Sequence, residues 1–121
     1  MSEEAAGPKV TEVRPQLVKS VEKFNERAKS DPKFQETLKD MERKILLEVT
    51  GDATYHFHLK DNHIDGVRDG PVAQPQVTVT VDKDTLLAIF NGEQSAMRAY
   101  MSRKLKFQAT LMDLLVLKKL F

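Results

Sequence analysis

The amino-acid sequence predicts a single α+β domain, and three features of its apolar pattern support this. Apolar residues recur at helical spacing from Val10 to Ala28. They then alternate with polar residues over 54–60 and 76–82, as expected for strands with one buried face. The last segment, 111–121, is again helical in pattern and nearly all apolar. Helices before and after a run of strands indicate an α+β fold.

Length and composition fit one globular domain. The chain has 121 residues, 40% hydrophobic and 31% charged, and no cysteine, which excludes disulfides and thiolate metal sites. Residues 1–9 are polar and contain glycine and proline, so we expect a disordered tail before a domain over 10–121. No segment reaches the roughly 20 apolar residues of a transmembrane helix, and residues 1–10 lack the apolar core of a signal peptide. We therefore expect a cytoplasmic protein.

Two helices are predicted in the first third of the chain. The first should begin between Thr11 and Pro15, because proline is tolerated only in the first turn of a helix. Asp31-Pro32 is typical of an N-cap followed by proline at the first helical position, and it predicts a short second helix.

Four strands joined by hairpins are predicted next. A β-rich run over 45–50 stops at a Gly51-Asp52 turn, and Asp61-Asn62 forms a two-residue turn into a short strand over 63–68. The fourth strand is 76–82. The large apolar residues of these strands should share one buried face: Tyr55, Phe57, Leu59, Val77, Val79 and Val81.

Two more helices and a fifth strand lead to the final helix. Residues 82–84 should start a helix that ends at Gly92, and Ser95 should cap the next one. Alternation over 104–110 predicts the fifth strand, and Thr110 with Asp113 forms a capping box for the last helix.

The final helix is apolar nearly all round, so it must be covered on more than one side. Eight of the eleven residues over 111–121 are apolar. Three covers remain open on pattern alone: the core of the protein, a second subunit, or an apolar ligand.

Positive charge accumulates at the same end. Residues 98–121 carry six basic side chains against Asp113 alone, a net charge of +5, while the other 97 residues carry −4. Basic and apolar residues together favour an anionic lipid surface over nucleic acid, since aromatic stacking platforms are missing. A merely solvated basic face is the alternative.

Catalytic motifs are missing from the sequence. The glycines form no phosphate loop, and neither Ser20 nor Ser102 stands in the context of a catalytic nucleophile. His56 and His58, with His63 and Asp65 across the predicted turn, could bind zinc, although that face of the sheet should be exposed to solvent. We expect no enzyme activity and no cofactor, with the zinc site as a minor alternative.

Two stretches, 77–121 and more loosely 24–34, resemble the sterol carrier protein-2 family in its short stand-alone prokaryotic form. The resemblance rests on a valine strand, an acid-led helix, Asn91-Gly92, the Ala99-Tyr100-Met101 helix and Lys104-Leu105-Lys106-Phe107. It extends over residues 10–121. The family commonly has glycine where Arg103 and Ala109 stand here.

The resemblance implies a five-stranded mixed sheet, covered on one face by about five helices and enclosing an apolar tunnel that the C-terminal helix helps to close. It implies binding of sterols, fatty acids, acyl-CoA or phospholipid without a reaction. The residues expected to contact the ligand are Phe57, Val79, Phe90, Met97, Tyr100, Met101, Phe107, Leu111, Met112 and Leu115.

Two further expectations concern partners. A carrier must unload at a membrane, and the residues expected to face anionic headgroups transiently are Arg98, Arg103, Lys104 and Lys106. The alternative function is a protein-interaction module that forms a homodimer through the apolar C-terminal helix.

Overall fold

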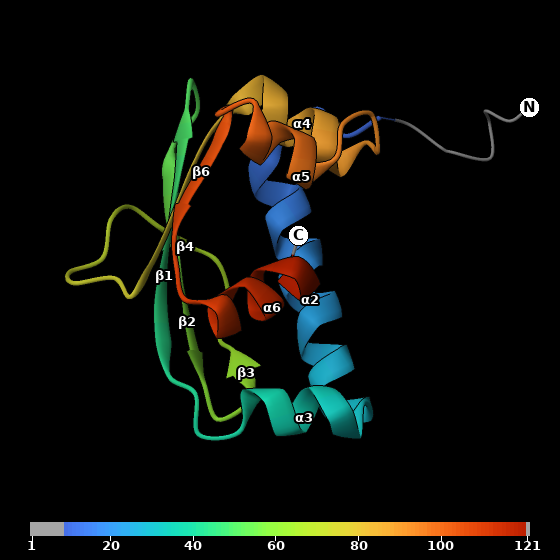
Figure 1. Ribbon diagram of the computed structural model, residues 1–121, viewed down its shortest axis with the longest axis vertical. Helices are drawn as coiled ribbons and strands as arrows, with labels where there is room; N and C mark the ends of the chain where they lie inside the picture. Colours follow the sequence, from blue (N-terminus) through green and yellow to red (C-terminus); the bar gives the residue numbers. More distant parts are fainter. Residues whose placement is uncertain (1–8, 121) are drawn as a thin grey trace, which may run out of the picture.

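The computed structural model describes residues 9–120, which form a mixed β-sheet with helices over one of its faces (Figure 1). Except for Lys9, the tail predicted over residues 1–9 lies outside this range, as does Phe121. The elements in chain order are α2 (Val13–Ser30), α3 (Pro32–Leu38), β1 (Arg43–Thr50), β2 (Thr54–Lys60), β3 (His63–Ile64), β4 (Arg68–Asp69), β5 (Val77–Asp82), α4 (Lys83–Phe90), α5 (Ala96–Met101), β6 (Leu105–Gln108) and α6 (Leu111–Leu120). The predicted α+β class is confirmed, and the described residues contain the expected five helices.

The first two helices follow the predicted signals. Helix α2 begins at Val13, which leaves Pro15 in its first turn. The Asp31 side chain accepts hydrogen bonds from the backbone N–H groups of Lys33 and Phe34, at 3.0 and 3.3 Å, and so caps α3. The rings of Phe24 and Phe34 then meet edge to face at 5.1 Å, which fixes α3 against α2.

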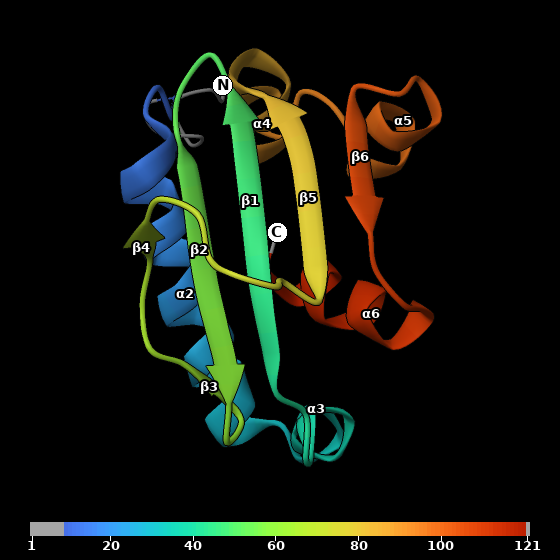
Figure 2. The same ribbon diagram turned by 90° about the vertical axis from the view of Figure 1, so that its left-hand side faces the viewer.

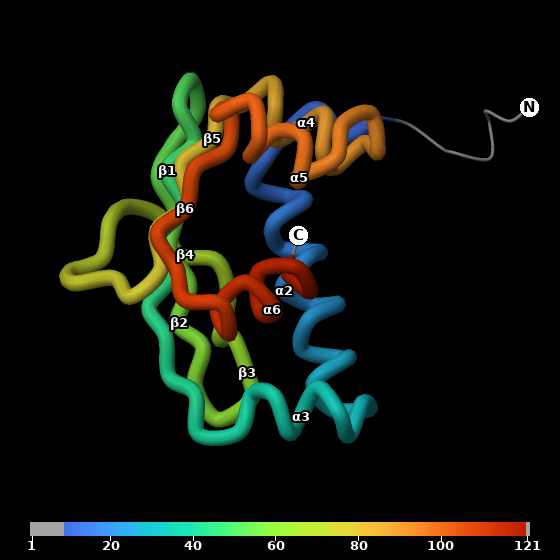
Figure 3. The backbone as a smooth tube through the Cα atoms, in the orientation of Figure 1, coloured from blue at the N-terminus to red at the C-terminus, as the bar shows by residue number. Residues whose placement is uncertain are grey.

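The strand order in the sheet is β3-β2-β1-β5-β6, with β4 also paired to β2. Strands β1 and β5 are parallel, while every other pair is antiparallel, so the sheet is mixed as predicted. Figure 2 shows β6 at one edge of the sheet. The path of the chain in Figure 3 places α5 and α6 at opposite ends of this edge strand.

The prediction that hairpins join all four strands over 45–82 is wrong for the last of them. Hairpins connect β1 to β2 and β2 to β3, but β5 pairs in parallel with β1. The loop between β4 and β5 crosses the uncovered face of the sheet to reach it (Figure 2). The parallel register aligns Val77, Val79 and Val81 with three apolar residues of β1, and all of them are buried. A hairpin from β4 would have left β5 at the far edge, away from these partners.

The single strand predicted over 63–68 is also wrong in detail. It is divided into β3 and β4, which pair with different parts of β2. Between them Gly66 has a φ of +125°, a backbone conformation that interrupts an extended strand and that side-chain-bearing residues rarely adopt. The sheet therefore has six strands in the described residues, not five.

The expected parity of the sheet is confirmed. The valines of β5 and the apolar residues of β2 face the helices, where none is more than 4% exposed. Helix α2 completes this core with apolar residues at helical spacing: Leu17, Val21, Phe24 and Ala28. Leu86 of α4 and Ala99 of α5 are buried in the same core. Both helices therefore lie on the predicted face of the sheet (Figure 1).

Candidate functional site

Exposed apolar side chains gather in one part of the chain. Within residues 9–120, every large hydrophobic residue that is exposed lies between Met97 and Leu115. These residues are Met97, Tyr100 and Met101 of α5, and Leu111, Met112 and Leu115 of α6. A soluble protein scatters its exposed apolar residues, and a concentration of them marks a binding surface. We call this set the apolar surface.

The local structure of α5 explains why its methionines are exposed. Ser95 caps the helix by accepting a hydrogen bond from the Arg98 N–H at 3.1 Å, as predicted. Ala99 is fully buried and is the only buried residue of this six-residue helix. Met97 and Met101 therefore point away from the core and are 67% and 73% exposed. Methionines adapt their shape to irregular apolar partners.

Strand β6 connects the two helices and adds an aromatic contact. The rings of Tyr100 and Phe107 stack at 4.6 Å with an interplanar angle of 8°. Phe107 is half-buried and packs against the core, which anchors the exposed ring of Tyr100. The apolar surface thus has a rigid aromatic member between its flexible methionines.

Helix α6 is buried on one side only. Its buried residues are Asp113, Val116, Leu117 and Leu120, which face the protein. Leu111 is 80% exposed, and Met112 and Leu115 are about half exposed. The core therefore accounts for only one of the sides that the sequence predicts to be covered.

A partly buried ion pair holds α6 against the sheet. Arg43 of β1 donates a hydrogen bond from Nε to Asp113 Oδ1 at 2.8 Å, and the Asp113 side chain is 3% exposed. The predicted capping box is present as well, since Thr110 and Asp113 exchange hydrogen bonds of 3.1 and 3.2 Å. Burial raises the pKa of the Asp113 carboxyl, but hydrogen bonds from Thr110 and Arg43 outweigh it and leave the pKa below its ordinary value.

The ten predicted contact residues fall into two groups. Six of them form the apolar surface. Phe57 and Val79 are buried inside the sheet core, while Phe90 and Phe107 are partly buried and pack against that core. The enclosed apolar tunnel that would join the two groups stays a prediction.

The predicted membrane-facing residues are all exposed, but they do not share one face. Arg98 lies on α5 beside the methionines, and Arg103 and Lys104 follow directly after that helix. Lys106 is opposite Thr80 in the sheet register, and side chains alternate along a strand, so it points to the face that the helices leave uncovered. Of the four, only Arg98 belongs to a helix that contributes to the apolar surface.

Two of the histidines of the predicted zinc site, His56 and His58, contact oxygen atoms of other residues. His56 Nδ1 lies 2.9 Å from the carbonyl oxygen of Gly70, and His58 Nε2 lies 3.0 Å from Glu42 Oε2. Residues 9–120 contain no group of three histidine, cysteine, aspartate or glutamate side chains placed to hold a metal ion. Across the same range, none of the helices combines the length and apolarity that crossing a membrane requires.

Solved structures share this fold. The conserved hypothetical protein TT1886 from Thermus thermophilus superposes with a TM-score of 0.65 at 15% identity, over 94% of this chain and 88% of that one. The ubiquinone synthesis protein UbiJ-SCP2 gives 0.60 at 14% identity, over 92% and 93%. Palmitated SCP2L2 from Aedes aegypti gives 0.57 at 20% identity, over 83% and 90%. No curated protein sequence matches the chain significantly.

The fold and the exposed apolar side chains define a small α+β domain with an apolar surface at α5 and α6. Residues 21–121 match the SCP-2 sterol transfer family, and the chain belongs to this family. Membership of this family supports binding or transfer of a lipid or sterol, in agreement with the resemblance seen in the sequence.

Proposed function

We propose that this protein binds and carries an apolar lipid without chemical reaction, using the apolar surface and the core residues beneath it. The main observation behind this proposal is that the exposed large hydrophobic residues of the described chain all lie on α5 and α6. Family membership supports the same function. The ligand classes we expect are fatty acid, acyl-CoA, phospholipid and sterol-like molecules, and the cytoplasmic location stays part of the prediction.

In this proposal α6 acts as the closing wall of the lipid site. Its outer face offers Leu111, Met112 and Leu115 to an acyl chain, while Val116, Leu117 and Leu120 on its inner face are buried in the core, where α6 contacts α2. In this proposal a shift of α6 away from the core gives the ligand access to core residues, with Phe57 and Val79 among the expected contacts. Burial of apolar area at about 25 cal/mol per Å² supplies the binding energy.

The test is to make the outer face of α6 polar while leaving its buried face intact. The triple variant Leu111→Gln, Met112→Gln, Leu115→Gln should fold, because these side chains are exposed. It should bind a fluorescent fatty acid at least about tenfold more weakly, since loss of two or more CH₂-sized contacts removes well over 1 kcal/mol. Lys19→Gln with Glu22→Gln on the exposed side of α2 is the control and should bind as the wild type does. Undiminished binding by a folded triple variant would contradict the proposal.

A second candidate function uses the same surface for a homodimer. The exposed face of α6 favours it, because two such faces would cover each other. Sedimentation equilibrium without lipid distinguishes the two candidates. A dimer that the triple variant converts to a monomer supports self-association, whereas a monomer that binds fatty acid supports the carrier.

A further inference from the structure

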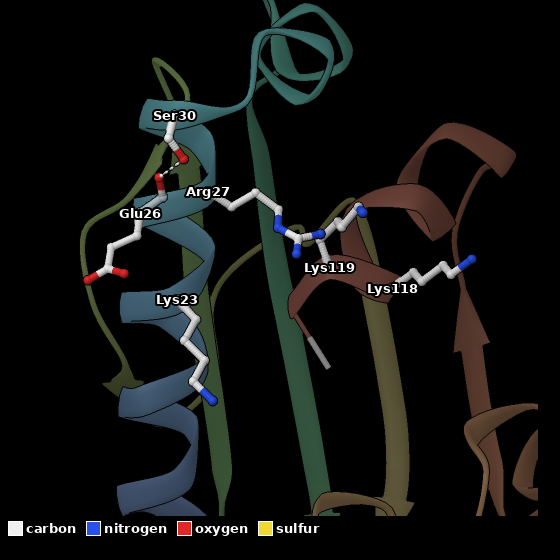
Figure 4. A pocket seen from close by; sticks show the side chains of 6 residues that line it. All are labelled: Lys23, Glu26, Arg27, Ser30, Lys118 and Lys119. Carbon is white, nitrogen blue, oxygen red and sulfur yellow. Dashed lines mark hydrogen bonds between the residues drawn. The ribbon is translucent and has the colours of Figure 1, made fainter.

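Four basic side chains from two helices surround one depression between α2 and α6 (Figure 4). Lys23 and Arg27 come from the second half of α2, and Lys118 and Lys119 come from the last turn of α6. Glu26 and Ser30 complete the lining, and the depression has a volume of about 600 Å³. None of the residues of the apolar surface lines this basic depression, and neither do the basic residues after α5.

The folding of both helices fixes these cations in place. Phe24 and Ala28 of α2 are buried, and the basic residues that immediately precede them in the chain, Lys23 and Arg27, flank this buried face. On α6, Lys118 and Lys119 stand between two buried leucines. In Figure 4 the side chain of Arg27 extends from α2 across the gap between the helices and ends beside Lys119 of α6.

Carboxylates of the described residues do not neutralise this cluster. The ion pairs formed within residues 9–120 involve other side chains, and none includes Lys23, Arg27, Lys118 or Lys119. Glu26 points away from the cations in Figure 4. Each helix C-terminus contributes about half a negative charge. Four cations less one carboxylate and two helix ends leave about two positive charges, so the cluster attracts an anion.

We propose that the basic depression binds a phosphate-bearing anion. A phosphate group presents several oxygens, so one group can accept hydrogen bonds from Arg27 and from lysines of both helices at once. The planar guanidinium of Arg27 suits a bidentate contact with phosphate, and the lysines add point charges around it. The volume lies within the roughly 300–1,000 Å³ typical of small-molecule sites. Binding there would bridge α2 and α6 and hold the terminal helix in its docked position.

Two probes distinguish the source of the phosphate. Inorganic pyrophosphate represents a soluble phosphate compound, and monomeric short-chain phosphatidic acid represents a lipid headgroup. Each is titrated into the isotope-labelled protein at about 0.1 M salt, where weak non-specific attraction is screened over about 10 Å. The backbone amide signals of α2 and the end of α6 should shift. If only phosphatidic acid shifts them, the ligand is a headgroup; if pyrophosphate does so as well, phosphate alone is sufficient.

Matched charge reversals decide whether the site is specific. Arg27→Glu with Lys119→Glu should weaken binding of the effective probe at least about tenfold, since two charge-assisted hydrogen bonds are lost. Lys29→Glu with Lys33→Glu lowers the net charge equally at exposed positions outside the depression, and it should change the affinity less than about twofold. If the reversal variant fails to fold, Arg27→Gln with Lys119→Gln replaces it. Failure of both probes to bind the wild type, or equal weakening in the control, overturns the proposal, and neither result depends on whether the apolar surface binds lipid.

Discussion

At the scale of single residues, the Asp113 carboxylate performs two tasks. One oxygen accepts a hydrogen bond from the Thr110 N–H and caps α6, and the other accepts one from Arg43 of β1. Arg43 is under a third exposed and Asp113 is almost fully buried, so removing the charge of one partner leaves the other poorly solvated. The start of α6 thus depends on an ionised carboxylate, whereas the rest of the helix depends on apolar contacts.

Replacing Asp113 by asparagine should therefore destabilise the protein by about 1–3 kcal/mol at neutral pH, because a charge-assisted hydrogen bond to Arg43 is lost. The folded pKa of Asp113 is lowered, so the ionised group stabilises the fold above its unfolded pKa of about 3.9. This stability is lost as the pH falls through the lower folded pKa. Urea unfolding should show a constant gap between wild type and Asp113→Asn above about pH 5, and a shrinking gap below about pH 4.

The control for this experiment is Asp84→Asn, which removes an exposed carboxylate from the first turn of α4. It should cost less than about 1 kcal/mol, the amount expected from the helix dipole alone. A gap for Asp113→Asn that does not respond to acid would mean that shape or packing, and not charge, makes this residue important.

At the scale of elements, α4 and α5 end in the same way with different residues. After α4, the N–H groups of Gly92 and Glu93 bond to the carbonyls of Ile89 and Ala88; after α5, those of Arg103 and Lys104 bond to Tyr100 and Ala99. Both are Schellman motifs, whose left-handed residue is normally glycine. Gly92 has a φ of +72°, as the predicted helix end requires, and Arg103 has +66° despite its side chain.

Arg103→Gly should stabilise the protein by up to about 1 kcal/mol. The left-handed conformation costs an L-residue about 1–2 kcal/mol, and the entropy of glycine in the unfolded chain offsets about 0.5–1 kcal/mol of the gain. Denaturant unfolding measures the change. Arg103→Ala keeps the strained backbone and loses the same charge, so it should stay within about 0.5 kcal/mol of wild type. Equal stabilisation by alanine would show that charge repulsion, not backbone strain, is relieved.

Local signals predicted most elements, and contacts between distant segments account for the errors. Helix caps and tight turns depend on only a few neighbouring residues. The structure confirms the predicted caps at Asp31, Ser95 and Thr110 and the turn at Asp61-Asn62. The parallel pairing of β1 with β5 has no such local signal in the sequence, because the two strands are distant in the chain. The same holds for Arg43 and Asp113, which are 70 residues apart.

The candidate site was predictable to a similar degree. The apolar excess of the last quarter located the residues of α5 and α6, but the side to which each points depends on packing. Lys106 shows this, because its direction follows from its register opposite Thr80. The basic depression was also missed, since its cations approach one another only when α6 folds back beside α2.

At the scale of the whole molecule, the α5 part of the apolar surface lies at the same end of the fold as a group of basic residues. Arg98 follows Met97 on α5, Arg103 and Lys104 come directly after this helix in the chain, and all three are exposed, while α3 lies at the other end of the molecule (Figure 1). An apolar surface with a basic rim suits transient contact with an anionic membrane, since each basic residue near such a surface is worth about 1 kcal/mol. Three such contacts give weak, reversible attachment, which suits delivery better than anchoring.

This predicts binding to vesicles that contain anionic lipid, weaker binding to neutral ones, and a loss of binding as salt is raised. Arg98→Glu with Arg103→Glu should reduce the affinity for anionic vesicles by roughly thirtyfold or more, since at least about 2 kcal/mol of attraction is removed. Lys33→Glu with Lys39→Glu, in α3 and directly after it, lowers the net charge equally at exposed positions, so it should have a much smaller effect. Lys106→Glu should resemble this control because Lys106 faces the other side of the sheet. Co-sedimentation at low and high salt measures all four proteins, and equal losses in both double variants would show that total charge, not the rim around the apolar surface, directs the protein to membranes.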